Sequence, residues 1–128
     1  MTVLDTHVWV WWVADDDRLT QTQRSAIEQA DGRGVSAISC WEVAKLAELG
    51  RLVLDRPVLE WLRAALAYPG VRLLPLSPEV AAGSAALPGT FHRDPADQII
   101  VATARAYGCP VITSDRKILA YAHVETVA

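Results

Sequence analysis

Short apolar runs that alternate with longer helix-like segments are the feature that most constrains the fold of this 128-residue chain. The runs are almost entirely apolar, as expected of strands whose two faces are both covered by helices. Their alternation with helical segments of about ten residues predicts an α/β domain around a mainly parallel sheet of four to five strands, flanked by helices. The expected strands are Val3–Leu4, Val35–Ile38, Val71–Leu76, Pro110–Thr113 and Val124–Val127.

Capping and chain-breaking residues set the expected helix boundaries. Thr6–Val13 is interpreted either as a short helix or as a bent extension of the first strand. Thr20 and Ser39 are predicted N-caps, Gly50 is a predicted C-terminal stop, and Pro57 is placed in the first turn of its helix. The first of the capped helices ends near Gln29, and the others are expected at Cys40–Leu49, Val58–Leu66, Pro78–Ala86, Asp94–Tyr107 and Asp115–Tyr121.

The length suits a single domain covering residues 1–128. The chain has 12 Lys and Arg residues against 15 Asp and Glu residues, which excludes a protein that binds nucleic acid mainly through excess positive charge. Cys40 and Cys109 are too few for a disulfide framework or a cysteine zinc site. The apolar run Val8–Ala14 is far shorter than the roughly 20 residues of a membrane span. We therefore expect a soluble, cytoplasmic protein that has no membrane contact.

Several acidic residues fall beside the predicted strand ends, where ligands bind in an open α/β sheet. Asp5 directly follows the first strand, Asp115 directly follows the fourth, and Glu42 is in the first turn of the helix after the second. Asp94 and Asp97 begin the helix that runs into the fourth strand, so strand order alone leaves the position of Asp97 open. Each of these acids can also be interpreted as a helix cap or as a partner of the helix dipole.

Carboxylates that cluster repel one another unless a cation neutralises them. An all-oxygen set of this kind suits Mg²⁺ or Mn²⁺, so we expect a hard divalent cation if the acids meet. His7, His92 and His123 are too far apart in the sequence for zinc-ligand spacing, and each is interpreted as a turn or surface residue. His7 is the exception among them, because it lies two residues after Asp5.

Three segments, in this order, resemble the PIN-domain ribonucleases and, among them, the VapC-type toxins of bacterial toxin–antitoxin pairs. They are VLDTHVWVWW (Val3–Trp12), ISCWEVAKLAELGRL (Ile38–Leu52) and HRDPADQIIVATARAYGCPVITSD (His92–Asp115). The third is the most specific, through its D-P-x-D helix and its T-x-D ending. The stretch from Leu54 to Leu87 carries no diagnostic residue.

The resemblance implies that Asp5, Glu42, Asp97 and Asp115 form an acidic set that binds one or two Mg²⁺ or Mn²⁺ ions. It leaves Asp94 as a cap, a ligand through water or a substrate contact. It also implies an endoribonuclease toxin that leaves a 5′-phosphate and a 3′-hydroxyl, forms a homodimer and is inhibited by a cognate antitoxin. Accessory positions beside the acids are Thr6, Ser39, Thr113 and Ser114.

The basic residues next to these segments are candidate phosphate contacts, and each can equally be a solvated surface charge. They are Arg93, Arg116, Lys117 and Lys45. The five tryptophans are interpreted mainly as core or interface residues, with base stacking as the alternative. Apolar stripes on the helices 41–52 and 58–66 could contact a second copy or a partner helix.

Two other functions remain open from the sequence. One is a Mg²⁺-dependent phosphohydrolase with Asp5 as its nucleophile, although Asp5-Thr6-His7 lacks the second acid of the haloacid dehalogenase pattern. The other is a non-catalytic module that binds a partner, in which the acids are only helix caps.

Overall fold

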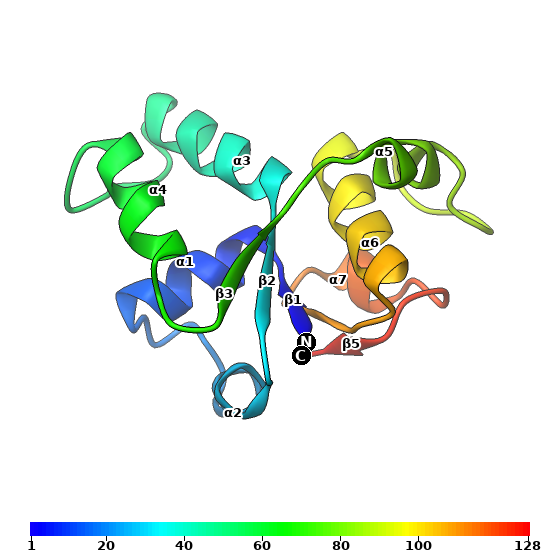
Figure 1. The fold of residues 1–128 in the computed structure, drawn as a ribbon, viewed down its shortest axis with the longest axis horizontal. Helices are drawn as coiled ribbons and strands as arrows, with labels where there is room; N and C mark the ends of the chain where they lie inside the picture. The colour runs from blue at the N-terminus through cyan, green and yellow to red at the C-terminus, as the bar shows by residue number, and fades with distance from the viewer.

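A five-stranded parallel sheet lies at the centre of the computed structural model, which describes residues 1–128 (Figure 1). Its strand order is β3-β2-β1-β4-β5, and every neighbouring pair is parallel. The predicted α/β class is confirmed. The strands are β1 (Thr2–Leu4), β2 (Arg33–Ser36), β3 (Val71–Leu74), β4 (Val111–Ile112) and β5 (Thr126–Val127).

The strand order indicates where a ligand would bind at the edge of the sheet. The chain moves from β1 outward to β3 in one direction, and then returns to add β4 and β5 on the other side of β1. Parallel sheets bind ligands in the crevice at the carboxyl ends of the strands where the order reverses. In this protein that point lies between β1 and β4, so the residues that follow Leu4 and Ile112 enter the crevice.

Helices cover both faces of the sheet, with α1, α3 and α4 on one side and α5, α6 and α7 on the other (Figure 1). None of them is long and apolar enough to cross a membrane. Their bounds are α1 (Thr6–Ala14), α2 (Gln21–Gln29), α3 (Ala37–Glu48), α4 (Val58–Leu66), α5 (Pro78–Ala85), α6 (Pro95–Tyr107) and α7 (Arg116–Leu119).

Two hydrophobic cores form because successive strand side chains point to opposite faces. In β1, Leu4 packs into the core that contains Trp9 of α1 and Trp61 of α4, whose rings meet edge to face with centroids 5.2 Å apart. Val3 packs into the other core with Ile100 of α6. Each such buried apolar side chain contributes about 1.5–3 kcal/mol to folding, and together they fix the first strand and helix around the crevice.

The predicted cap of α3 was wrong. Ser36, not Ser39, is the N-cap, and its hydroxyl accepts a hydrogen bond from the backbone N of Ile38 at 3.3 Å. The apolar character of Ile38 predicts the end of a strand. Its side chain instead packs against the core beside α6. The helix therefore starts earlier than predicted, and Ser39 lies inside it, fully buried.

Several other predicted strands and helices are longer than the observed ones. The third strand stops before Pro75, which has no N–H for the ladder, and the fourth covers only Val111–Ile112. Pro57 is the N-cap residue of α4 rather than part of its first turn. The open choice for Thr6–Val13 is resolved as a helix, and the last helix covers only Arg116–Leu119.

Candidate active site

Asp5 occupies the centre of the crevice, directly after β1. Its Oδ1 accepts a hydrogen bond from the backbone N of Thr6 at 2.8 Å, which caps α1, and its Oδ2 accepts one from the Thr113 hydroxyl at 2.7 Å. Only 7% of the residue is exposed. Burial raises the pKa of Asp5, while the hydrogen bonds from Thr113 and Thr6 oppose the rise. The carboxylate is thus held rigidly by groups that follow the two central strands, β1 and β4.

A second set of hydrogen bonds joins α1 to α3. The Thr6 hydroxyl lies 2.8 Å from the Ser39 hydroxyl and 2.5 Å from Oε1 of Glu42, to which it donates. Burial raises the pKa of Glu42, the Thr6 hydrogen bond lowers it, and the nearby charge of Asp5 raises it. The two accessory positions Thr6 and Ser39 therefore lie where they orient Glu42 toward the crevice.

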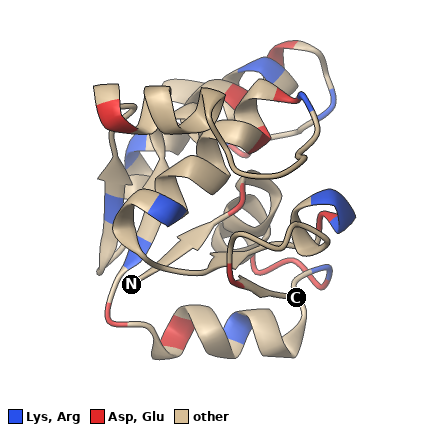
Figure 2. Ribbon diagram, turned by 90° about the vertical axis from the view of Figure 1, so that its right-hand side faces the viewer, with Lys and Arg blue, Asp and Glu red and all other residues tan.

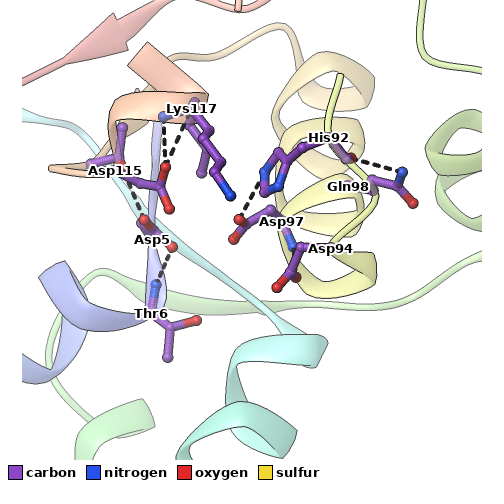
Figure 3. Close-up of polar contacts among 10 residues, drawn as sticks. Asp5, Thr6, His92, Asp94, Asp97, Gln98, Asp115 and Lys117 are labelled. Atoms are coloured by element: carbon purple, nitrogen blue, oxygen red, sulfur yellow. Dashed lines mark hydrogen bonds and ion pairs between the residues drawn. The ribbon is translucent and has the colours of Figure 1, made fainter. Parts of the chain in front are cut away.

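The remaining acids come from the starts of two helices. Asp94 caps α6, and its Oδ1 accepts a hydrogen bond from the backbone N of Asp97 at 3.0 Å. Asp115 caps α7, and its Oδ1 accepts one from the backbone N of Lys117 at 2.8 Å. Figure 3 shows Asp5, Asp97 and Asp115 facing a common space, with Asp94 at its edge. The position of Asp97, open from strand order alone, is therefore beside the other acids.

Asp97 has the most strongly shifted pKa among the acids of the site. Burial and, in decreasing order, the charges of Asp94, Asp5, Asp115 and Glu42 together raise its pKa to about 7. Near neutral pH the cluster therefore holds a proton that an isolated aspartate would lose. Such a shift marks a carboxylate group whose negative charge is not balanced by its surroundings.

A hollow of about 310 Å³ lies among these side chains. No three acidic or histidine side chains converge on one point at distances that would hold a metal ion. The hollow is therefore a crowded acidic space rather than a preformed coordination cage. Its lining consists of Asp5, His7, Trp11, Glu42, Asp94, Asp97, Ser114 and Asp115.

His92 lies in a loop, as its prediction as a turn or surface residue requires, but its side chain is only 20% exposed and contacts the site. Its Nε2 lies 3.0 Å from Oδ2 of Asp97, an ion-pair distance without hydrogen-bond alignment. The loop that carries it is fixed by the Gln98 side chain, which donates to the His92 carbonyl at 3.0 Å, and by the Phe91 ring, 4.4 Å from the imidazole. Spacing in the sequence could not place His92 beside Asp97, because the contact depends on how this loop folds back over α6.

Gln23 of α2 is a site residue that the sequence reasoning missed. It is fully buried, and its Nε2 donates to the Thr113 carbonyl at 3.2 Å and to the Ser114 hydroxyl at 2.8 Å. Its Oε1 accepts from the backbone N of Thr20, which completes a capping box. Gln23 therefore holds the segment after β4, from which Thr113 reaches Asp5. The Thr20-x-x-Gln23 spacing is the signal that could have drawn attention to it.

Replacement of Gln23 by alanine is expected to destabilise the protein by about 1–3 kcal/mol, because it leaves the buried Thr113 carbonyl without its donor. Urea denaturation of the Gln23→Ala variant measures the change. Gln21→Ala is the matched control, since Gln21 is exposed on the same helix, and it should change stability by no more than about 0.5 kcal/mol. Equal stability of the two variants would contradict the role of Gln23.

The four candidate phosphate contacts differ in their surroundings. Lys45 pairs with Glu48 along α3, with 3.1 Å between Nζ and Oε1. Arg93, Arg116 and Lys117 are exposed and make no ion pair. The Lys117 side chain extends toward the space between Asp115 and Asp97 in Figure 3. The Lys117 side chain therefore lies beside the acidic space.

The crevice and its acids define a domain class that comparison with known proteins confirms. The chain belongs to the PIN-domain family, whose model matches residues 2–124. It is 43% identical over 125 residues to Ribonuclease VapC22 of Mycobacterium tuberculosis (strain ATCC 25618 / H37Rv), a match that covers 98% of this chain and 95% of the relative. The predicted resemblance to VapC-type PIN proteins is therefore confirmed.

Solved structures show the same fold. A toxin–antitoxin complex from Klebsiella pneumoniae matches with a TM-score of 0.67 at 20% identity, over 95% of this chain and 92% of that chain. DNA-bound VapBC from Salmonella typhimurium matches with a TM-score of 0.69 at 16% identity, over 98% and 95%. At such low identities, the likeness concerns the fold alone.

Proposed function

We propose that this protein is a metal-dependent endoribonuclease of the VapC type, which hydrolyses RNA at the acidic hollow. The observation that carries the proposal is the group of acids at the point of strand-order reversal, with the pKa of Asp97 raised to about 7 by burial and by neighbouring charges. A relative that is 43% identical over most of the chain is named a ribonuclease, which supports RNA as the substrate.

The alternative functions explain the same side chains less well. Asp5, Asp94 and Asp115 do cap α1, α6 and α7, as the non-catalytic interpretation requires. Glu42 and Asp97 cap nothing, and both point into the hollow. A phosphohydrolase nucleophile at Asp5 is disfavoured, because both of its oxygens already accept hydrogen bonds in a buried position.

The donor set fits Mg²⁺ or Mn²⁺ in its chemistry. All the candidate ligands are carboxylates, which these cations prefer, and crowding leaves their negative charge uncompensated. Mg²⁺ keeps several of its waters and is commonly held by only one or two carboxylates. Three converging protein ligands are therefore not a requirement. We assign Asp5 and Asp115 as the rigid ligands, with Glu42 and Asp97 completing the site directly or through water.

A bound divalent cation would supply a water of lowered pKa and charge stabilisation at the phosphate. The chain's own groups have separate tasks. Asp97, with its pKa near neutrality, is suited to take a proton from the attacking water, as is Glu42. Thr113 and Thr6 fix the orientation of Asp5 and Glu42. Lys117 is placed to meet a phosphate oxygen beside the acids. Arg93, Arg116 and Lys45 make only weaker contacts with the RNA in this proposal.

A cognate antitoxin and a second copy of the chain are the proposed protein partners. One solved neighbour is titled a toxin–antitoxin complex and another is VapBC. Exposed apolar side chains on and between α3 and α4 offer contact surface, including Leu49, Val53 and Leu59. Both cysteines are free thiols, which goes with the proposed cytoplasmic location.

The proposal is tested by incubating purified protein, free of any antitoxin, with total RNA in the presence of Mg²⁺, Mn²⁺ or a chelator. Discrete cuts that carry 5′-phosphate and 3′-hydroxyl ends, and that disappear with the chelator, are the expected result. Cuts that persist in the chelator would contradict the metal dependence. No cleavage of any RNA under any metal, by protein that is folded, would contradict the activity.

His92 should act as a positioning residue for Asp97. Groups that orient carboxylate ligands typically change metal affinity by about 10–100-fold when they are removed, and the His92 Nε2 lies 3.0 Å from Oδ2 of Asp97. We therefore expect His92→Ala to weaken Mn²⁺ binding within this range, as measured by calorimetry, and His92→Gln to restore part of it by placing an N–H group near Asp97. His123→Ala is the control, since His123 packs on Tyr121 away from the hollow. Unchanged affinity in His92→Ala would contradict the role.

A further inference from the structure

Two other hollows adjoin the acidic one, and they differ sharply in charge. The first lies between α3 and α6, beside the exposed Trp41, and it shares the carboxylates Glu42 and Asp94 with the acidic hollow. The second, of about 310 Å³, shares His7 and Trp11 with it and contains no acidic residue. An anionic strand that leaves the acidic hollow is therefore repelled along the first and not along the second.

The second hollow contains two arginines with different surroundings. Arg18 is bound in a fork to Asp16, with Nη2 2.8 Å from Oδ2 and Nε 3.1 Å from Oδ1, so its charge is already matched. Arg51 follows Gly50 at the end of α3, where it is exposed and makes no ion pair. Arg51 is thus the positive charge of this hollow that a ligand can use.

Trp11 forms the junction between this hollow and the acidic one. Its side chain is half-buried and lines both of them. The Arg18 guanidinium lies 5.4 Å from the centroid of its ring, and the His7 ring lies 6.1 Å away. The paired Arg18 therefore supports the indole from one side. An aromatic ring that is fixed next to a positive charge is the arrangement that single-stranded nucleic acids use for stacking and backbone contact.

We propose that the groove formed by His7, Trp11, Arg18 and Arg51 binds the single-stranded RNA next to the scissile phosphate. Trp11 stacks on a neighbouring base, and Arg51 contacts a flanking phosphate. The inference rests on the proposed ribonuclease function and adds the path that the substrate takes. It is also compatible with the charge distribution, because Lys and Arg are scattered over the ribbon and form no single basic face (Figure 2). A few well-placed contacts must then hold the strand.

The test measures binding of a fluorescent single-stranded oligoribonucleotide of mixed sequence by anisotropy, with Mg²⁺ present and in an Asp5→Asn background that prevents cleavage. Loss of one phosphate contact on a single strand lowers the slope of log affinity against log salt by about 0.7. Arg51→Ala is expected to show this lower slope, and Arg51→Lys is expected to restore it. Arg63→Ala removes an exposed arginine that does not line either hollow, and it should leave the slope unchanged.

Trp11 should affect affinity without affecting the salt dependence. Loss of one stacking contact lowers affinity by between about 5- and 150-fold. Trp11→Leu is expected to show this loss with an unchanged slope, and Trp11→Phe should retain part of the affinity and of the fold. With Asp5 restored, Arg51→Ala should raise KM for RNA cleavage and leave kcat unchanged.

Different results would overturn the groove assignment and the proposed ribonuclease activity. If the wild-type chain neither binds nor cleaves RNA, the ribonuclease function is wrong. If it cleaves RNA, and Arg51→Ala and a folded Trp11→Leu variant match it in affinity, slope and KM, only the groove assignment is overturned. Loss of antitoxin binding in those two variants, with RNA binding unchanged, would assign the groove to a protein segment instead.

Discussion

Asp5→Asn is expected to lower the rate of RNA cleavage by at least about 10³-fold while the protein remains folded. The substitution removes the charge that is held most rigidly in the hollow, and metal-assisted hydrolysis depends on that charge to hold the cation. Asparagine keeps the size of the side chain and an oxygen that accepts from the backbone N of Thr6. The Thr113 hydroxyl can rotate to accept from the new amide. Cleavage rates and thermal melts of the variant give the two readouts.

The matched control is Asp17→Asn, because Asp17 is an exposed aspartate that follows the same helix and lies outside the hollow. It should retain the cleavage rate of the wild type. An Asp5→Asn variant that is folded and cleaves RNA within tenfold of the wild-type rate would contradict the assignment of Asp5.

Asp97→Asn is expected to stabilise the metal-free protein above neutral pH. The pKa of Asp97 is raised from 3.8 to about 7, chiefly by burial, so the folded state binds a proton that the unfolded state has lost. The favourable contribution of this group is fully present below about pH 4 and is lost as pH rises to about 7 and above. At pH 8 the wild-type fold contains a charged Asp97 in a crowded acidic space, at a cost on the order of 1–2 kcal/mol after solvent screening.

Denaturation of both proteins between pH 5 and pH 8.5 measures this difference. The free energy of unfolding of the wild type should fall relative to that of Asp97→Asn across this range. Mn²⁺ should reverse the order at pH 8, because a cation that replaces the proton stabilises only the wild-type cluster. A variant that is less stable than the wild type at pH 8 without metal would show that Asp97 is not under electrostatic repulsion.

The sequence could predict the sheet and the acids at its edge because both depend on local patterns. Apolar runs that are separated by evenly spaced chain-breaking residues define strands between helices. The strand order then places the residues after Leu4 and Ile112 at the crevice. Asp5 and Asp115 were therefore predicted at the crevice from the residues alone. The position of Asp97 beside the other acids was predicted only from the family resemblance, since a helix start has no fixed position relative to a sheet edge until its connections are known.

The contacts that could not be predicted are those made by side chains across distant segments. Gln23 is an ordinary helix residue by its sequence, and its bond to the Thr113 carbonyl depends on how α2 packs against β4 and β5. His92 lies in a loop whose path is set by Gln98 and Phe91. Ser39 was expected to cap α3, because serine favours that position, and tertiary burial against Thr6 outweighed the preference.

The central claim is that the acidic hollow binds a divalent cation, and titration with Mn²⁺ followed by calorimetry tests it most directly. The wild-type protein at pH 8 should bind one or two ions with saturation, and binding near pH 7 should release a proton from the cluster. Asp5→Asn and Asp97→Asn should bind Mn²⁺ much more weakly, and Asp17→Asn should bind as the wild type does. Folded wild-type protein that shows no saturable Mn²⁺ binding would contradict the account.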